Sequence, residues 1–230
     1  MNPQVPHHQP SWRIIRHDIK LSVISAGVFA LAASGVLTSY GQGLTRLYSD
    51  PQQYGLWYLG VSYGLVLVLQ DTYFYFTHRW FHHPKLFRWF HQGHHRSRYP
   101  TPWTSFAFDP LEAIGQSLFL LGIVFVVPLH FVTLIATLTT MTVWAILTHL
   151  GLDRLPALFP HHWLGQWLIG PAHHSIHHLK YTVHYGLYFT FWDQLLGTQD
   201  AGYQKALADR PGGKVAPPRG PTSDRPRRQS

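Results

Sequence analysis

The feature that most constrains this chain is a run of 40 residues, 113–152, that contains no Asp, Glu, Lys or Arg. A straight helix of that length rises about 1.5 Å per residue and would far exceed the roughly 30 Å hydrocarbon core of a bilayer. Pro128 lies near the middle of the run, and proline breaks or kinks a helix. The run therefore predicts a membrane-embedded helical hairpin with its tip near Pro128, Leu129 and His130.

Two earlier stretches are also apolar enough to cross a membrane. Residues 21–45 contain no charged residue and no histidine, and residues 54–76 are mostly apolar. A spanning helix needs about 20 such residues. A secretory signal peptide is the alternative for the first stretch, although the polar lead of about 20 residues is long for one. Together with the hairpin, these stretches predict an all-α integral membrane protein with about four transmembrane helices.

The basic residues predict how the chain is oriented. Arg13, Arg16 and Lys20 precede the first stretch, whereas the segment 41–51 between the two stretches holds only Arg46 and Asp50. Five more basic residues follow the second stretch: Arg79, Lys85, Arg88, Arg96 and Arg98. Because positive charge accumulates on the cytoplasmic side, both termini and the histidine-rich segments are expected in the cytoplasm.

The order of these segments divides the chain into three parts. Residues 1–20 are a cytoplasmic N-terminal segment, and residues 21–200 form the membrane-embedded domain. Residues 201–230 are rich in Pro, Gly and Arg and are expected to be a disordered basic tail. The net charge of +8 is better explained by contact with anionic lipid than by binding to a nucleic acid.

The composition excludes several kinds of site. The chain has no cysteine, which rules out disulfides, thiolate metal sites, iron–sulfur clusters and cysteine nucleophiles. Glu112 is the one glutamate. A carboxylate-bridged di-iron bundle needs several glutamates, and a zinc protease of the His-Glu-x-x-His type needs a different motif. The 18 histidines are therefore the main candidates for metal-binding or catalytic residues.

Eight of these histidines follow a spacing that places side chains on one face of a helix. Residues three or four positions apart on a helix are neighbours. The spaced sets are His78 with His82, then His91 with His94 and His95, then His174 with His177 and His178. His149, at the end of the predicted hairpin, would be a ninth imidazole. Nine nitrogens suffice for two metal ions with open positions, so we predict a dimetal site in a histidine-rich helical cap.

The other histidines are weaker candidates. His7, His8, His17 and His130 are expected to be ordinary polar or surface groups, and His83, His161, His162 and His173 lie next to the spaced sets. Neutral imidazoles leave the charge of a metal uncompensated, so carboxylates are expected behind them. The candidates for that role are Asp71, Asp153 and Asp193.

With these motifs identified, the chain resembles the fatty acid hydroxylase/sterol desaturase superfamily of membrane di-iron enzymes over about residues 71–198. The resemblance rests on one His-x3-His box and two His-x2-His-His boxes. Within the superfamily the chain looks most like the C-5 sterol desaturase (lathosterol oxidase) branch. The strings that support this are Pro-Thr-Pro-Trp at 100–103, Ala-Phe-Asp-Pro at 107–110, the block 173–178 and the block 191–198.

Three positions depart from the pattern of that branch. Asp109 stands where the branch usually has a histidine, and His149-Leu-Gly stands where it usually has His-Asp-Gly. His184-Tyr-Gly replaces the usual Asn-Tyr-Gly of the superfamily. His184 is therefore either an added metal ligand or a substitute for the hydrogen-bonding amide.

The resemblance implies an O2-dependent oxidoreductase that hydroxylates or desaturates an unactivated C–H bond of a lipid, whether sterol-like, terpenoid or fatty acyl. It implies two Fe ions, for which Zn can substitute on purification, and dioxygen as co-substrate. It also implies electrons from a separate cytochrome b5-like or ferredoxin-like protein. One alternative is a carotenoid hydroxylase or ketolase. Another is a histidine-rich metal-handling membrane protein, although transport ligands are usually found at mid-membrane.

Overall fold

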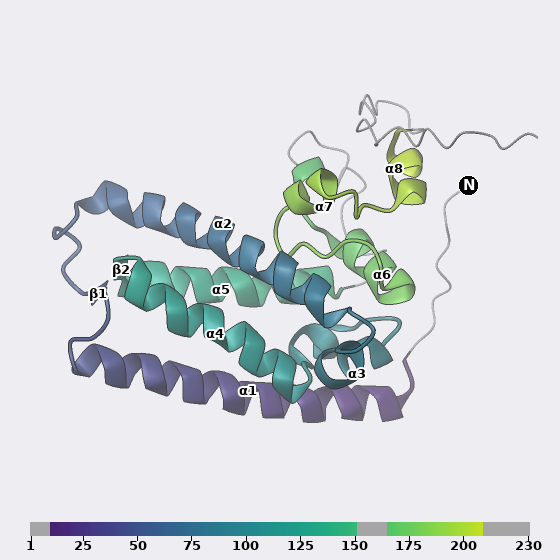
Figure 1. Cartoon of the computed structure of the whole chain (residues 1–230), viewed down its shortest axis with the longest axis horizontal. Helices are drawn as coiled ribbons and strands as arrows, with labels where there is room; N and C mark the ends of the chain where they lie inside the picture. The colour runs from purple at the N-terminus through teal and green to yellow at the C-terminus, as the bar shows by residue number, and fades with distance from the viewer. Residues whose placement is uncertain (1–9, 151–164, 209–230) are drawn as a thin grey trace, which may run out of the picture.

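Four long helices dominate the computed structural model, which describes residues 10–150 and 165–208. They are α1 (Trp12–Gly41), α2 (Leu56–Phe81), α4 (Pro110–Val126) and α5 (Phe131–Thr148), and they lie side by side (Figure 1). Helices α1 and α5 are long and apolar enough to cross a membrane, and α4 is a shorter apolar helix. The mostly helical fold with membrane-compatible helices was expected from the sequence.

The predicted hairpin is confirmed, with its tip where the sequence placed it. Helix α4 ends at Val126 and α5 begins at Phe131, with Pro128 between them. His130 caps α5, because its Nδ1 accepts a hydrogen bond from the backbone N–H of Val132 at 3.0 Å. Its Nε2 donates to the carbonyl of Ser49 at 2.8 Å. His130 is therefore a structural polar group, as expected.

A short parallel pairing, which the sequence did not predict, ties the hairpin tip to the loop between α1 and α2. Strand β1 (Leu47–Tyr48) pairs with β2 (Leu129–His130) in the register Leu47 to Leu129 and Tyr48 to His130. Buried apolar side chains surround this end of the bundle, including Val36, Val66 and Val124. Both loops therefore lie at one end of the bundle (Figure 1).

Two helices extend beyond the expected spans. Helix α1 begins at Trp12 rather than near residue 21, so much of the expected N-terminal segment is helical. Asp18 on this extension is buried and accepts hydrogen bonds from Ser97 Oγ and Thr104 Oγ1, all at 2.8 Å. Helix α2 continues past residue 76 to Phe81 and carries His78. Packing against the loops outside the apolar region explains why these helices do not end where the apolar pattern does.

The outer surface of the bundle is largely apolar, as expected for helices in contact with lipid. Large apolar side chains such as Val23, Leu31 and Ile135 are exposed on the outside. Small polar side chains such as Ser25 and Ser62 are fully buried between the helices. Small residues at helix contacts and apolar residues facing outward are the pattern of membrane helices.

The remaining helices gather at the end of the bundle opposite β1 and β2 (Figure 1). They are α3 (Phe87–Phe90), α6 (Pro171–Lys180), α7 (Phe191–Leu195) and α8 (Ala201–Ala208). Helix α8 corrects the expectation of disorder for residues 201–208, because the Asp200 carboxylate accepts the N–H of Tyr203 at 2.8 Å and caps the helix. The rest of the expected tail, 209–230, lies outside the described residues.

Candidate metal centre

The nine predicted ligands come together in two groups at this end of the bundle. The five-histidine group consists of His78, His82, His91, His95 and His177, and the four-histidine group of His94, His149, His174 and His178. Within each group, one ring nitrogen of every member lies within 4.8 Å of those of the others. The groups are adjacent: the ring centroids of His95 and His178 are 4.6 Å apart, and those of His91 and His94 are 5.0 Å apart.

The sequence boxes do not correspond to the groups. Helix α6 carries the third box, and successive helical residues are about 100° apart. As a result His177 belongs to the five-histidine group, whereas His178 belongs to the four-histidine group. A box with the predicted spacing therefore supplies ligands to both groups.

The second box does not form the predicted helical face. Helix α3 ends at Phe90, and His94 begins a separate short 3-10 helix, η1 (His94–Arg96). The intervening turn is held by Asp109, which accepts the N–H of Gly93 at 2.6 Å and leaves no room there for a side chain. Asp109, the first departure from the branch pattern, thus orders the loop that separates His91 from His94.

The backbone sets the orientation of several rings. Nδ1 of His78 lies 3.0 Å from the carbonyl oxygen of Tyr185, and Nδ1 of His177 lies 2.7 Å from that of Val183. Nδ1 of His149 lies 2.6 Å from the carbonyl oxygen of its own helix, at Ala145. A carbonyl can only accept, so each of these Nδ1 atoms carries the proton and each Nε2 carries a lone pair.

The lone pairs face one another at distances that fit a shared cation. Nε2 of His177 lies 3.0 Å from Nε2 of His95 and 3.1 Å from Nε2 of His82. In the other group, Nε2 of His174 lies 2.9 Å from Nε2 of His149. Adjacent ligands of a six-coordinate ion, each about 2.1 Å from the metal, lie about 3.0 Å apart. The residues therefore fit two metal ions, one in each group.

The rings are held in the form that binds metal. Burial, and after it the neighbouring imidazoles, keeps the pKa of six of them well below the ordinary value of 6.5. The six are His91, His94, His95, His174, His177 and His178. Because a metal binds the neutral imidazole, the folded chain presents these ligands already deprotonated.

Glu112 was missed as a site residue from the sequence. Its side chain is fully buried in the first turn of α4, and its Oε1 lies 2.8 Å from Nδ1 of His91. The signal was present, because an acidic residue at the edge of a long charge-free run is costly to bury unless it has a partner. Asp71 was expected to be a supporting carboxylate, whereas Glu112 served only to exclude other kinds of site.

Two of the predicted carboxylates lie near the rings without touching them. Oδ1 of Asp71 accepts the backbone N–H groups of residues 187–189, the shortest from Tyr188 at 2.7 Å. Asp193 accepts the N–H groups of Tyr185 and Gly186, both at 2.9 Å. Burial raises the pKa of Asp193 to about 6 despite these bonds. Asp193 holds the backbone of Tyr185, whose carbonyl orients His78, so it supports that ring indirectly. Asp71 anchors the backbone of residues 187–189.

His184 lies outside both groups. Its φ of 58° is in the left-handed region, which asparagine and histidine adopt more readily than most residues. Its Nε2 accepts the N–H of Asp200 at 3.2 Å, and burial lowers its pKa to about 4. Backbone conformation and a hydrogen bond account for a histidine at the position where the superfamily usually has asparagine.

The remaining candidates are placed as follows. His173 is buried outside the groups, where its Nδ1 accepts the N–H of Gly170 at 3.1 Å at the start of α6. His83 is exposed, and His17 is half-buried on α1. Several predicted or neighbouring positions lie outside the described residues, namely His7, His8, Asp153, His161 and His162.

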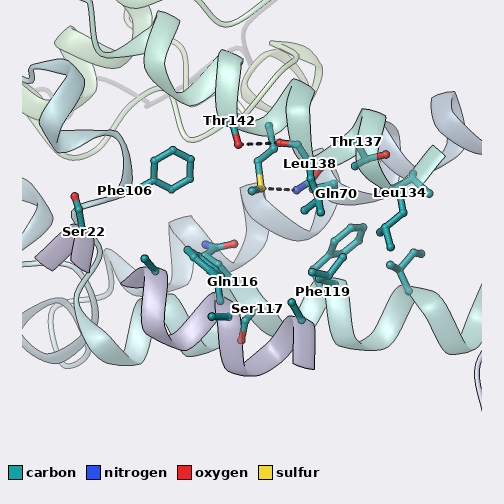
Figure 2. Close-up of a pocket in the computed structure, with 18 residues that line it drawn as sticks. Ser22, Gln70, Phe106, Gln116, Ser117, Phe119, Leu134, Thr137, Leu138 and Thr142 are labelled. Carbon is teal, nitrogen blue, oxygen red and sulfur yellow. Dashed lines mark hydrogen bonds between the residues drawn. The ribbon is translucent and has the colours of Figure 1, made fainter. Parts of the chain in front are cut away.

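The interior holds a small cavity among the histidines and a large one among the long helices. A small one of about 40 Å³ is lined by His78 and His91, by His94, His149 and His174, and by Glu112. A large one of about 510 Å³ lies among α1, α2, α4 and α5, and its lining is mostly apolar (Figure 2). Gln116 lines the large cavity and follows Glu112 by one turn of α4. The large apolar cavity therefore begins one helical turn of α4 beyond Glu112.

Comparison with known proteins agrees with this site. The model of the fatty acid hydroxylase family, "Fatty acid hydroxylase", matches residues 63–198, which include all nine grouped histidines. The chain belongs to the fatty acid hydroxylase family. Membership confirms the resemblance expected from the histidine boxes and the expected enzyme class, an oxidoreductase.

The family member's curated relatives include sterol-modifying enzymes. The chain is 30% identical over 227 residues to the Delta(7)-sterol 5(6)-desaturase ERG3B of Gibberella zeae, covering 90% of this chain and 68% of that protein. It is 32% identical over 186 residues to the lathosterol oxidase of Homo sapiens, covering 80% and 60%. The chain therefore spans about two thirds or less of the length of these relatives. No solved structure matches it.

Proposed function

We propose that this family member is an O2-dependent membrane oxidoreductase that hydroxylates or desaturates an unactivated C–H bond of a lipid at a di-iron centre. The observation that carries the proposal is the arrangement of nine imidazoles, eight of them buried and one half-buried, in two adjacent groups, with an apolar cavity that begins one helical turn beyond Glu112. The relatives' names, which refer to sterols, favour a sterol-like substrate over a terpenoid or a fatty acyl chain.

In this proposal the five-histidine group holds one iron ion and the four-histidine group the other. The bound iron pair supplies the activation of dioxygen that oxidation of an unactivated C–H bond requires. The protein supplies the rest. The carbonyls of Tyr185, Val183 and Ala145 orient the rings, and burial keeps water out of the site. The carboxyl group of Glu112, 2.8 Å from Nδ1 of His91, limits how that ring can turn.

The same proposal covers topology and the electron donor. Helices α1, α2, α4 and α5 span the membrane, and the histidine end faces the cytoplasm. Exposed basic side chains at that end support this orientation, among them Arg79, Arg88 and Arg96. The electrons come from a separate cytochrome b5-like or ferredoxin-like protein, and an acidic surface on such a protein would complement these basic groups.

The test is expression of the chain in a lipid-producing host, followed by mass spectrometry of total lipids. The expected result is a lipid that has gained one oxygen atom or lost two hydrogen atoms. A His94→Ala variant made at equal protein level is the matched control and should give neither change. Accumulation of oxidised carotenoids alone would favour the carotenoid hydroxylase or ketolase. Bound metal with no altered lipid would favour the metal-handling protein.

A further inference from the structure

The large cavity suits an uncharged occupant. Its lining contains no Asp, Glu, Lys, Arg or His. A carboxylate or a phosphate buried there would have no counter-ion, and burying an unpaired charge is very unfavourable. The buried part of a lipid in this cavity must therefore be neutral.

Six lining side chains are polar, and five of them already make a contact within the protein. Four hydroxyl groups donate to backbone carbonyls: Ser22 to Trp103, Ser117 to Ile114, Thr137 to Thr133 and Thr142 to Leu138. The amide of Gln70 contacts Met141 Sδ at 3.2 Å and accepts the Tyr188 hydroxyl at 2.8 Å. The four hydroxyl groups therefore have no vacant donor, and both the nitrogen and the oxygen of the Gln70 amide have a partner.

Gln116 differs from the other five. Its Nε2 is buried from solvent and has no hydrogen-bond partner in the part of the chain that the structure describes. Figure 2 shows its amide group turned toward the interior of the cavity, on the same side as Phe106. A buried donor without a partner is unfavourable, and an acceptor atom on a bound lipid would satisfy it.

The position of Gln116 defines which end of the cavity is polar. On α4 the lining residues run from Gln116, one turn beyond Glu112, to Ile123 near the hairpin tip. The far end is lined by apolar side chains, including Ala33, Val66 and Leu134. Along α1 the lining extends from Ser22 to Ala33, a rise of about 16 Å. The vacant donor thus lies at the end beside the histidine groups.

We infer that Gln116 binds the oxygen atom of a neutral lipid alcohol, whose apolar body extends from there toward the hairpin tip. In this pose the oxygen-bearing end of the lipid is the end nearest the metal centre. The C–H bond that is oxidised then lies within a few bonds of that oxygen. The position of oxidation rests on the proposed function, but the binding of the alcohol to Gln116 does not.

The experiment measures binding and needs no turnover. The full chain, reconstituted in detergent, is titrated with 5α-cholestan-3β-ol and with 5α-cholestane, which lacks the hydroxyl group, and ligand-induced thermal stabilisation is followed. The parent protein is expected to bind the alcohol about tenfold more tightly than the hydrocarbon. Gln116→Met has a similar volume but no amide, so it should bind both probes equally and match the affinity of the parent for the hydrocarbon.

A second variant and a control guard against a general effect on folding. Gln116→Leu should repeat the loss of preference, and Ser117→Ala should keep it, because the Ser117 hydroxyl bonds to its own helix. The inference is overturned if the parent does not prefer the alcohol, or if both Gln116 variants keep the preference. A parent that prefers the alcohol but alters no lipid in the host would refute the proposed function and leave the role of Gln116 intact.

Discussion

The two histidine groups use the same side chain, yet their surroundings differ. The five-histidine group has a buried carboxylate, Glu112, at 2.8 Å from His91. Among the described residues, no carboxylate is in such contact with a ring of the four-histidine group. The four-histidine group also has one ring fewer.

The groups differ as well in what they face. Three of the four rings in the four-histidine group line the small cavity, namely His94, His149 and His174. Only His78 and His91 of the five-histidine group do so. From this difference we predict a division of roles: the five-histidine group would hold its ion more firmly, and the four-histidine group would leave its ion more open to the cavity.

The largest expected effect comes from removing one ring from each group. His177→Ala and His178→Ala are neighbours on α6, but they should act on different ions. Each should abolish lipid oxidation, because a coordination position is lost. His178→Ala leaves three rings and should lower the metal content from about two to about one per chain, whereas His177→Ala leaves four rings and should weaken the binding of its ion. The measurement is elemental analysis after iron reconstitution.

The control for this pair is His83→Ala, which replaces an exposed histidine outside both groups and should retain both ions. Retention of two ions per chain by His178→Ala would contradict the assignment of four rings to a separate metal site.

A smaller effect is expected from Glu112→Gln, which replaces the carboxyl group beside His91 with an amide of the same shape. Loss of a group that supports a metal ligand typically lowers metal affinity about 10- to 100-fold. The loss should affect the ion of the five-histidine group, while the other ion keeps its affinity. Chelator competition followed by metal analysis would resolve two classes of ion. A uniform weakening of both would show that the carboxylate serves the pair rather than one group.

Acidification of the metal-free protein should have a graded effect. Burial lowers the pKa of the ring histidines below 6.5, so the unfolded chain binds protons that the folded chain does not. The contribution of these histidines to the free energy of unfolding is therefore fully present above about pH 7 and is lost as the pH falls through 6.5 toward 5. Carboxyl groups whose pKa is raised by burial act in the opposite direction, among them Asp109 and Asp193, the latter with a pKa of about 6, but the buried histidines are more numerous.

The check is the midpoint of thermal unfolding across this pH range, with and without metal. Bound metal competes with protons for the same nitrogens, so the decline should shift to lower pH in the loaded protein. A metal-free midpoint that stays constant from pH 7 to pH 5 would contradict the burial of these rings as neutral groups.

The smallest effect is expected at His184, which belongs to neither group. His184→Asn should keep both ions and change stability by less than about 1 kcal/mol, because asparagine tolerates the left-handed backbone. His184→Ala should cost about 1–2 kcal/mol, since alanine does not. Metal analysis and denaturant unfolding distinguish the outcomes. Loss of one ion in His184→Asn would make His184 a ligand.

Features that depend on local sequence were predictable. The hairpin breaks at Pro128 because proline lacks a backbone donor and clashes with the preceding turn, whatever packs around it. The nine grouped histidines were recognised because their spacing and number are unusual in any chain. The contact of His130 with the carbonyl of Ser49 was expected only in general terms, as that of a polar group, because Ser49 is 81 residues away.

Only the tertiary structure decided which ring serves which group. The spacing of His177 and His178 shows that both can reach a metal, but their 100° separation on α6 assigns them to different groups once α2 and α5 pack on either side. The same holds for the carboxylates. Asp71 and Glu112 look alike in the sequence, as buried acids at the ends of apolar runs, but α4 brings Glu112 against His91 while Asp71 meets the backbone of residues 187–189. Spacing along a chain determines which side chains share a direction, and what they meet depends on the packing of distant elements.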